Sequence, residues 1–136
     1  MTRYIALIDG ETGGYGAVFP DFPGCTAMGE TMDAAMVNAA AALADYIDTA
    51  RAYGETVPEP RALEVLRDDP EVREALAAGA GFASIALVSG ISKPVKANLS
   101  LDAGVLAAID DAAGRLKITR SAMVELLARQ HLATVG

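Results

Sequence analysis

The sequence predicts an α+β protein with two modules, a βββαβ module over residues 1–90 and a β-α-α module over residues 91–136. In the first module, short β-rich runs precede a long segment whose apolar residues recur with the helical period. In the second, one strictly alternating stretch precedes two helical segments. Charge divides near the same point, because residues 1–92 carry five arginines against fourteen acidic residues, whereas the remainder carries six basic against four acidic residues. The resulting balances of −9 and +2 indicate modules with different partners.

The first module is predicted to begin with a β-hairpin. Residues 3–9 and 15–19 have the composition of strands, and the glycines between them supply a turn in which positive φ is cheap. Residues 20–24 contain two prolines, which cannot donate to a ladder, so an irregular crossing should precede a third short strand at 26–29. Residues 82–88 predict a strand that returns to the hairpin.

The helical part of the first module follows the third strand. Thr31 is a plausible N-cap, and apolar residues recur at helical spacing over residues 33–53. The two prolines in residues 58–60 mark a loop, and residues 70–78 predict a short helix that begins with proline. Residues 89–94 combine glycine, serines and proline, and they predict the linker to the second module.

The second module begins with a strand that is expected to have two different faces. Residues 95–101 alternate strictly, and two helices should follow, capped by Asp102 and Thr119. One face of the strand carries Ala97, Leu99 and Leu101, and the other carries Lys96, Asn98 and Ser100. One strand with two helices cannot satisfy its own edge or bury both apolar stripes, so we expect two copies to pair their strands antiparallel.

An antiparallel two-stranded ribbon can enter the major groove of DNA and read base edges from one face. Lys96 suits guanine or a phosphate, Asn98 suits adenine, and Ser100 can donate or accept. The alternation alone is equally compatible with the solvated face of an edge strand. At Thr119, the start of the last helix leaves the N–H groups of Arg120 and Ser121 for a phosphate, although an ordinary capped helix starts in the same way.

Residues 95–132 resemble a ribbon-helix-helix DNA-binding domain, on the ribbon KANLSL, the helix LDAGVLAAIDDAA and the second helix start LKITRSAMVELLA. The resemblance implies an obligate homodimer. It places Lys96, Asn98 and Ser100 at base-reading positions. It also implies that Thr119, Arg120 and Ser121 hold the phosphate.

The first module resembles the HicB antitoxin family. The matching motifs are a glycine hairpin, an aromatic strand, the turn PDFPGC at residues 20–25, the step GET at residues 29–31 and an alanine-rich helix. The resemblance implies a partial RNase H-like fold that masks a small HicA toxin, an mRNA-cleaving ribonuclease with a double-stranded-RNA-binding-like fold. Together the two resemblances imply an antitoxin that represses its own operon by binding operator DNA. Tyr15, Phe19 and Asp21 are our guesses for toxin contacts.

A metal-dependent nuclease is the enzymatic alternative, because several carboxylates lie near strand ends: Asp9, Glu11, Asp21, Glu30 and Asp33. Their places in turns and at a helix start explain them equally well by capping and dipole. Cys25 and His131 make a poor nucleophile-base pair, since Cys25 is expected to pack as a small apolar residue and His131 to cap a helix end. We therefore expect no catalytic residue, no metal and no cofactor.

The remaining expectations concern location and assembly. The longest apolar run, residues 39–44, is far shorter than a membrane helix, and the N-terminus lacks the pattern of a signal peptide, so a cytoplasmic protein is expected. Met32 and Met36 are expected in the core. The sequence leaves open whether dimers pair into tetramers. It also leaves open a stand-alone regulator whose first module senses a ligand or oligomerises.

Overall fold

A computed structural model describes residues 2–88 and 95–132 of the chain. The residues of the first range belong to one compact unit and those of the second to another. We call them the N-terminal unit and the C-terminal unit. The predicted linker, residues 89–94, lies outside the described residues.

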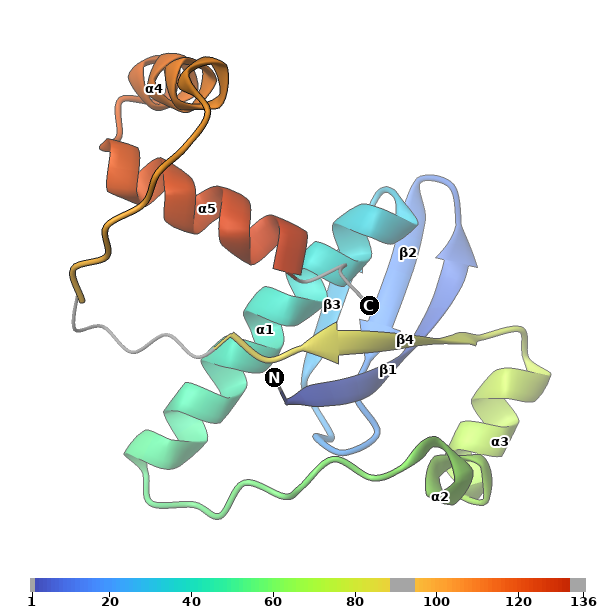
Figure 1. The fold of residues 1–136 in the computed structure, drawn as a ribbon. Coiled ribbons are helices and arrows are strands. Elements are labelled where there is room, and N and C mark those ends of the chain that lie inside the picture. The colour runs from blue at the N-terminus through green and yellow to red at the C-terminus, as the bar shows by residue number, and fades with distance from the viewer. Residues whose placement is uncertain (1, 89–94, 133–136) are drawn as a thin grey trace. The chain divides into compact units, whose positions relative to one another are not determined.

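The N-terminal unit is built on a four-stranded antiparallel sheet with the order β3-β2-β1-β4 (Figure 1). Its strands are β1 (Arg3–Glu11), β2 (Gly14–Val18), β3 (Thr26–Gly29) and β4 (Gly81–Ala86). In the register, Leu7 pairs with Val18 on one side and with Phe82 on the other. The predicted hairpin and the return of a late strand to it are both confirmed. The last strand ends at Ala86, two residues earlier than predicted.

The hairpin turn depends on glycine. Gly10 and Gly13 have φ values of 115° and 98°, which residues with a Cβ rarely adopt. A Cβ on Gly10 would lie 2.2 Å from the carbonyl oxygen of Gly14. The glycine cluster therefore fixes where the chain reverses, as the sequence predicts.

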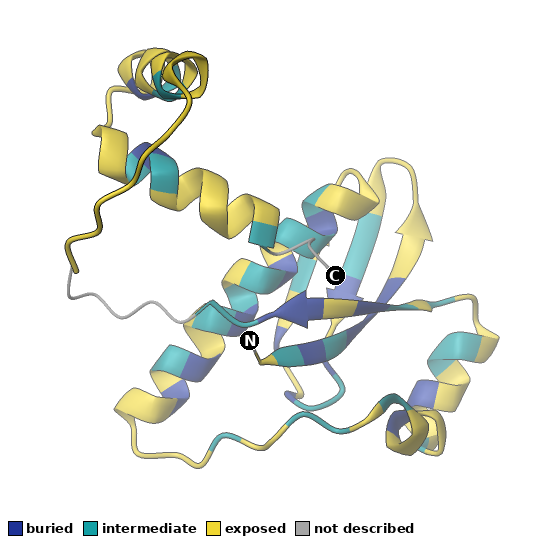
Figure 2. Ribbon diagram, in the orientation of Figure 1, coloured by how far each residue is buried: buried dark blue, intermediate teal, exposed yellow. Residues whose placement is uncertain are grey.

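Helix α1 (Met32–Ala52) packs against the sheet and contributes a buried face to the core (Figure 2). The Thr31 hydroxyl accepts a hydrogen bond from the Ala34 N–H at 3.1 Å, which confirms the predicted cap. Its buried residues recur every three or four positions, and they are Ala35, Ala39, Leu43, Ile47 and Ala50. Ala39, Leu43 and Ile47 belong to the same core cluster as alternate residues of β1, namely Tyr4, Ala6 and Ile8. Alanines on α1 and the absence of a side chain at Gly29 allow the helix to approach β3 closely.

Two short helices, α2 (Leu63–Arg67) and α3 (Pro70–Ala77), precede β4. Each has one fully buried side chain, Leu66 at 0% exposure and Val72 at 1%. The sequence predicts α3, whose N-cap Asp69 accepts from the Glu71 N–H at 2.9 Å. It does not predict α2, because five residues are too few to show a helical period.

The C-terminal unit contains α4 (Ala103–Leu116) and α5 (Arg120–Leu132). Asp102 caps α4 as predicted, through bonds of 2.9 Å and 3.2 Å from the first-turn N–H groups. The helix continues through Gly114. It ends when Lys117 adopts the left-handed conformation at φ 56°, which lets the Ile118 N–H donate to Ala113.

The predicted strand at residues 95–101 is absent from the single chain, where this segment is exposed and has no regular secondary structure. The physical reason is that a strand needs a neighbour for its N–H and C=O groups. The sequence supplies no other strand in this unit. Within the described ranges, none of the helices combines the length and apolarity that a membrane crossing requires.

Candidate functional site

The residues predicted to read DNA lie on the exposed segment that precedes α4. Lys96, Asn98 and Ser100 alternate with apolar residues, and every residue from 95 to 101 is exposed. The apolar set is exposed too, at 66% for Leu99 and 43% for Leu101. Side chains on both faces are therefore uncovered in the single chain. Lys96, Asn98 and Ser100 would form a regular row on one face only if a second strand paired with this backbone and held it extended.

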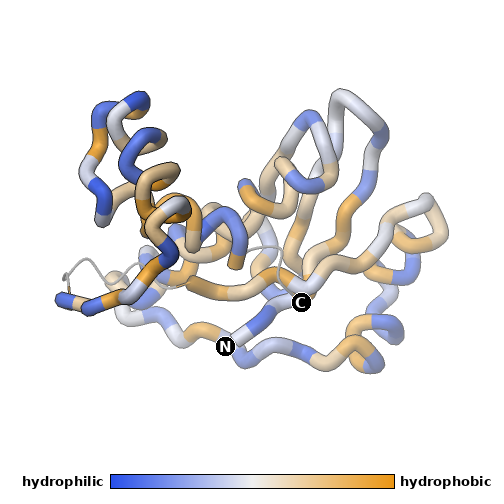
Figure 3. The backbone as a smooth tube through the Cα atoms, turned by 45° about the horizontal axis from the view of Figure 1, so that its top comes forward, coloured by the Kyte–Doolittle hydropathy of each residue, from blue (hydrophilic) through white to orange (hydrophobic). Residues whose placement is uncertain are grey.

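The helices of the C-terminal unit also leave apolar residues uncovered (Figures 2 and 3). Only Ala113 and Met123 are buried among residues 95–132. Val105 and Leu116 on α4 are 51% and 55% exposed, and Leu127 on α5 is 42% exposed. An open groove of about 530 Å³ lies between the segment and α5, lined by Leu99, Leu101, Leu106, Val124 and their neighbours. A folded chain rarely leaves so many apolar side chains in water without a partner.

The start of α5 carries the residues predicted to hold a phosphate. The Thr119 hydroxyl accepts from the Ala122 N–H at 3.1 Å, which confirms its place as N-cap. That bond satisfies one N–H group of the first turn. The N–H groups of Arg120 and Ser121 also belong to the first turn, where an α-helix supplies no backbone acceptor of its own. Ser121 is exposed, as a phosphate contact requires.

Arg120 has a partner that the sequence did not predict. Its Nε donates to Asp110 Oδ1 at 2.7 Å and its Nη2 to Oδ2 at 2.8 Å, a bidentate pair that joins α5 to α4. The hydrogen bonds from Arg120 lower the pKa of Asp110, and the same bonds raise the pKa of Arg120. Both side chains remain substantially exposed, at 60% and 43%. The guanidinium is thus oriented at the start of α5 by a carboxylate with which a phosphate would compete.

The guessed toxin contacts fall into two groups. Phe19 is 2% exposed and belongs to the core, and the side chain of Asp21 is 3% exposed. Their burial argues against direct contact with a partner and assigns both to the packing of the unit. Tyr15 is half-buried on β2 and remains a prediction.

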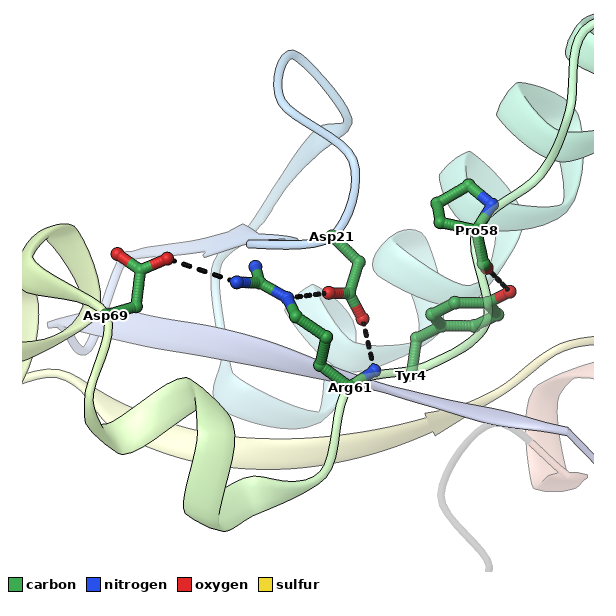
Figure 4. Close-up of polar contacts among 5 residues, drawn as sticks. All are labelled: Tyr4, Asp21, Pro58, Arg61 and Asp69. Atoms are coloured by element: carbon green, nitrogen blue, oxygen red, sulfur yellow. Dashed lines mark hydrogen bonds and ion pairs between the residues drawn. The ribbon is translucent and has the colours of Figure 1, made fainter.

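Asp21 is held by Arg61, forty residues later in the chain (Figure 4). Arg61 Nε donates to Asp21 Oδ1 at 2.6 Å, and the Arg61 backbone N–H donates to Oδ2 at 3.2 Å. Arg61 Nη1 also donates to Asp69 Oδ2 at 3.2 Å. These hydrogen bonds raise the pKa of Arg61, and the bond from Arg61 lowers the pKa of Asp69. The pair joins the PDFPGC turn to the segment that carries α2 and α3, a link that no spacing in the sequence indicates.

Three aromatic rings connect the same turn to α1. The rings of Tyr4 and Phe22 have centroids 4.8 Å apart, and those of Phe22 and Tyr46 are 5.5 Å apart. The Tyr4 hydroxyl donates to the Pro58 carbonyl at 2.7 Å (Figure 4), and burial raises its pKa. Tyr46 lies outside the sequence predictions, although its position one residue from buried Ile47 places it at the edge of the core face.

The remaining residues singled out in the sequence are a cysteine, two methionines and the possible metal ligands. Cys25 is 4% exposed and packs in the core as predicted, and its pKa is raised by burial and by the nearby charge of Asp45. Met36 packs against the core, whereas Met32 is 47% exposed, so its predicted burial is wrong. Met32 is the first residue of α1, and the buried residues of that helix begin only at Ala35. No three metal-binding side chains gather within the described ranges.

Comparisons with known proteins agree with one family. A family model described as the HicB-like antitoxin of bacterial toxin-antitoxin systems matches residues 4–128. The crystal structure of the Burkholderia pseudomallei antitoxin HicB is 30% identical, covering 97% of this chain and 99% of its own, with a TM-score of 0.56. The structure of its N-terminal domain is 28% identical and covers 64% of this chain and 99% of its own, with a TM-score of 0.51.

The chain is also similar to a chain of a toxin-antitoxin complex and to a phage protein. A chain of the HicA3 and HicB3 toxin-antitoxin complex is 26% identical and covers 64% of this chain and 99% of its own, with a TM-score of 0.53. An uncharacterised 14.9 kDa protein of the rep-hol intergenic region of Haemophilus phage HP1 (strain HP1c1) is 28% identical over 107 residues, which are 79% of this chain and 78% of that protein. Because the family model spans described residues of both units, the chain belongs to the HicB-like antitoxin family of bacterial toxin-antitoxin systems.

Proposed function

We propose that this chain is the antitoxin of a HicA/HicB-type toxin-antitoxin system. The N-terminal unit masks a HicA-like, mRNA-cleaving toxin. The C-terminal unit dimerises as a ribbon-helix-helix domain, binds operator DNA and represses the antitoxin's own operon. The observation that carries the proposal is the family match over residues 4–128, which takes in described residues of both units.

The N-terminal unit is the part proposed to bind the toxin. The chain matched in the HicA3 and HicB3 complex covers 64% of this chain, the same share as the separately crystallised N-terminal domain. Residues 1–92 carry a net charge of −9. A ribonuclease must attract phosphate and so has a basic surface, toward which an acidic unit is steered.

The C-terminal unit is proposed to function only as a dimer. Among the described residues, the segment 95–101 pairs with no strand, and only Ala113 and Met123 are buried among residues 95–132. A second copy would pair the two segments as an antiparallel ribbon and cover Leu99, Leu101 and the open helical faces. The same pairing would place Lys96, Asn98 and Ser100 on the free face of the ribbon, opposite the helices.

The toxin-binding proposal is tested with the product of the neighbouring gene. Expression of that product alone should stop growth, and co-expression of this chain should restore growth and yield a stable complex on purification. A neighbouring product that neither arrests growth nor binds the chain would overturn the antitoxin assignment. It would favour a stand-alone regulator.

The DNA-binding proposal is tested on the upstream region of the operon. Sedimentation equilibrium should give twice the chain mass of 14.0 kDa or a multiple of it. Asn98→Ala should lose about 1–3 kcal/mol of binding to the operator while non-specific binding is unchanged, because a base-edge amide is removed. Gln130→Ala, which removes an exposed amide from α5, is the matched control. Equal loss of specific and non-specific binding by Asn98→Ala would contradict the ribbon assignment.

A further inference from the structure

A pocket of about 420 Å³ lies in the N-terminal unit between the last turns of α1 and the end of the PDFPGC turn. Its wall on α1 is formed by Asp45, Tyr46, Thr49 and Tyr53, with Glu55 just beyond the helix and Cys25 on the opposite side. We call it the Tyr46 pocket. None of its residues belongs to the predicted toxin contacts.

The pocket presents two aromatic rings to solvent. Tyr46 is 38% exposed, and its ring is held by Phe22, whose centroid is 5.5 Å away. Phe22 in turn packs on Tyr4, which is hydrogen-bonded to Pro58. Tyr53 is the C-cap of α1 and is 80% exposed. The ring of Tyr46 is therefore oriented before any partner arrives, and the exposed ring of Tyr53 lines the same pocket.

The charge of the pocket is negative. Asp45 and Glu55 contribute two carboxylates, and no ion pair joins either one to a cation within the described part of the chain. The Asp45 charge is close enough to Cys25 to raise the pKa of its thiol. The C-terminal end of α1 adds the negative end of its dipole, although Arg51 lies in the same turn and makes an interaction of its own.

Aromatic faces beside carboxylates are complementary to a guanidinium group. The guanidinium stacks on tyrosine rings and donates in a planar fork to a carboxylate, whereas the lysine ammonium is a compact, strongly hydrated charge. The pocket is wide and open, which suits a side chain that projects from a protein surface. Tyrosine and arginine are also the residues that most often dominate the binding energy of protein interfaces.

We propose that the Tyr46 pocket receives an arginine side chain of the toxin, stacked between Tyr46 and Tyr53 and paired with the carboxylates of Asp45 and Glu55. The proposal rests on the antitoxin function, from which the basic partner follows. It adds the location of one contact and the chemical class of the group bound. The α1 helix thus has a core face against the sheet and, at its C-terminal end, a rim that binds the partner.

The test measures the affinity of the full-length chain for a catalytically inactive form of the neighbouring gene product. Asp45→Asn/Glu55→Gln and Tyr53→Ala should each raise Kd at least about tenfold, mainly through faster dissociation, because a desolvated contact is lost. Glu64→Gln/Glu74→Gln is the matched control, since it removes two exposed charges from α2 and α3 of the same unit. It should alter mainly the association rate and change Kd less than about threefold. Circular dichroism verifies that all variants remain folded.

The identity of the bound group is tested by changing the toxin. Exposed arginines of the toxin are replaced one at a time by alanine. One replacement combined with Tyr53→Ala should weaken binding no more than either change alone, as two partners in one contact require. Wild-type affinity for both pocket variants, or strict additivity with every toxin arginine, would overturn the proposal and leave the antitoxin function intact. Absence of any complex with the wild-type chain would overturn both.

Discussion

Arg61→Ala is the most informative change for the N-terminal unit, because it removes one partner of a buried ion pair. The carboxylate of Asp21 is 3% exposed, whereas the side chain of Arg61 is 36% exposed. The change deletes the 2.6 Å bond from Nε and the 3.2 Å bond to Asp69. It leaves the 3.2 Å bond from the residue 61 backbone N–H to Asp21.

The expected cost follows from these contacts. Removing one partner of a fully buried ion pair costs about 3–5 kcal/mol, because the other charge is left uncompensated. Two features make the loss smaller here. The backbone hydrogen bond to Asp21 is retained, and the Arg61 side chain is partly exposed, so water can occupy the place of the missing guanidinium. We therefore expect Arg61→Ala to lower the free energy of unfolding by about 2–3 kcal/mol. Asp21→Asn in the same chain should recover part of that loss, since no charge is then buried.

Tyrosine fluorescence during urea unfolding measures this effect in the unit concerned. The protein has no tryptophan and four tyrosines, and all four tyrosines lie at or before residue 53. For a unit of this size, each kcal/mol corresponds to about 4–8 °C in melting temperature, so a fall of about 8–24 °C is expected. The control is Arg73→Ala, which breaks a pair with Asp68 at 3.7 Å between side chains that are 69% and 81% exposed, together with an exposed hydrogen bond from Nε to the Arg67 carbonyl at 3.1 Å. It should cost no more than about 1 kcal/mol.

A loss for Arg61→Ala no larger than that of the control would refute the reasoning. It would mean that water solvates Asp21 freely once the guanidinium is gone. The pH dependence supplies a second check. Arg61 lowers the pKa of Asp69, so this contribution to stability is complete above the ordinary carboxyl pKa and is lost as pH falls through the folded value. The difference between wild type and Arg61→Ala should therefore shrink below about pH 4.

Three further predictions follow from the close contacts of the structure. Gly29→Ala would place a Cβ 2.3 Å from the Ala35 backbone nitrogen and should cost about 1–3 kcal/mol or more in urea unfolding, whereas Gly81→Ala enters open space and should cost much less. Because burial raises its pKa, Cys25 should react with a thiol reagent at pH 8 at least about tenfold more slowly than an unfolded control; equal rates would contradict its burial. Asp110→Asn frees Arg120 from its bidentate pair and should tighten non-specific DNA binding in a gel-shift titration, while Arg120→Ala should lower the salt slope by about 1; no change for either would exclude Arg120 from the phosphate contact.

Local sequence determined the elements that local interactions stabilise. The hairpin follows from glycines that reach positive φ, and α1, α4 and α5 begin after Thr31, Asp102 and Thr119, whose side chains accept from the first turn. The helical spacing of alanine and leucine predicted which face of α1 is buried. These features depend on residues within four positions of one another, so one sequence contains the information they need.

Tertiary structure alone decided which distant side chains meet. Nothing in the sequence connects Asp21 to Arg61, so the burial of Asp21 as an ion-pair partner is not predicted from the sequence. The pairing of Arg120 with Asp110 across two helices was missed for the same reason. The Tyr46 pocket likewise exists only because a turn and a helix end are brought together. Such contacts depend on the packed chain, because closing the loop between distant residues costs entropy that only the packing of the whole unit offsets.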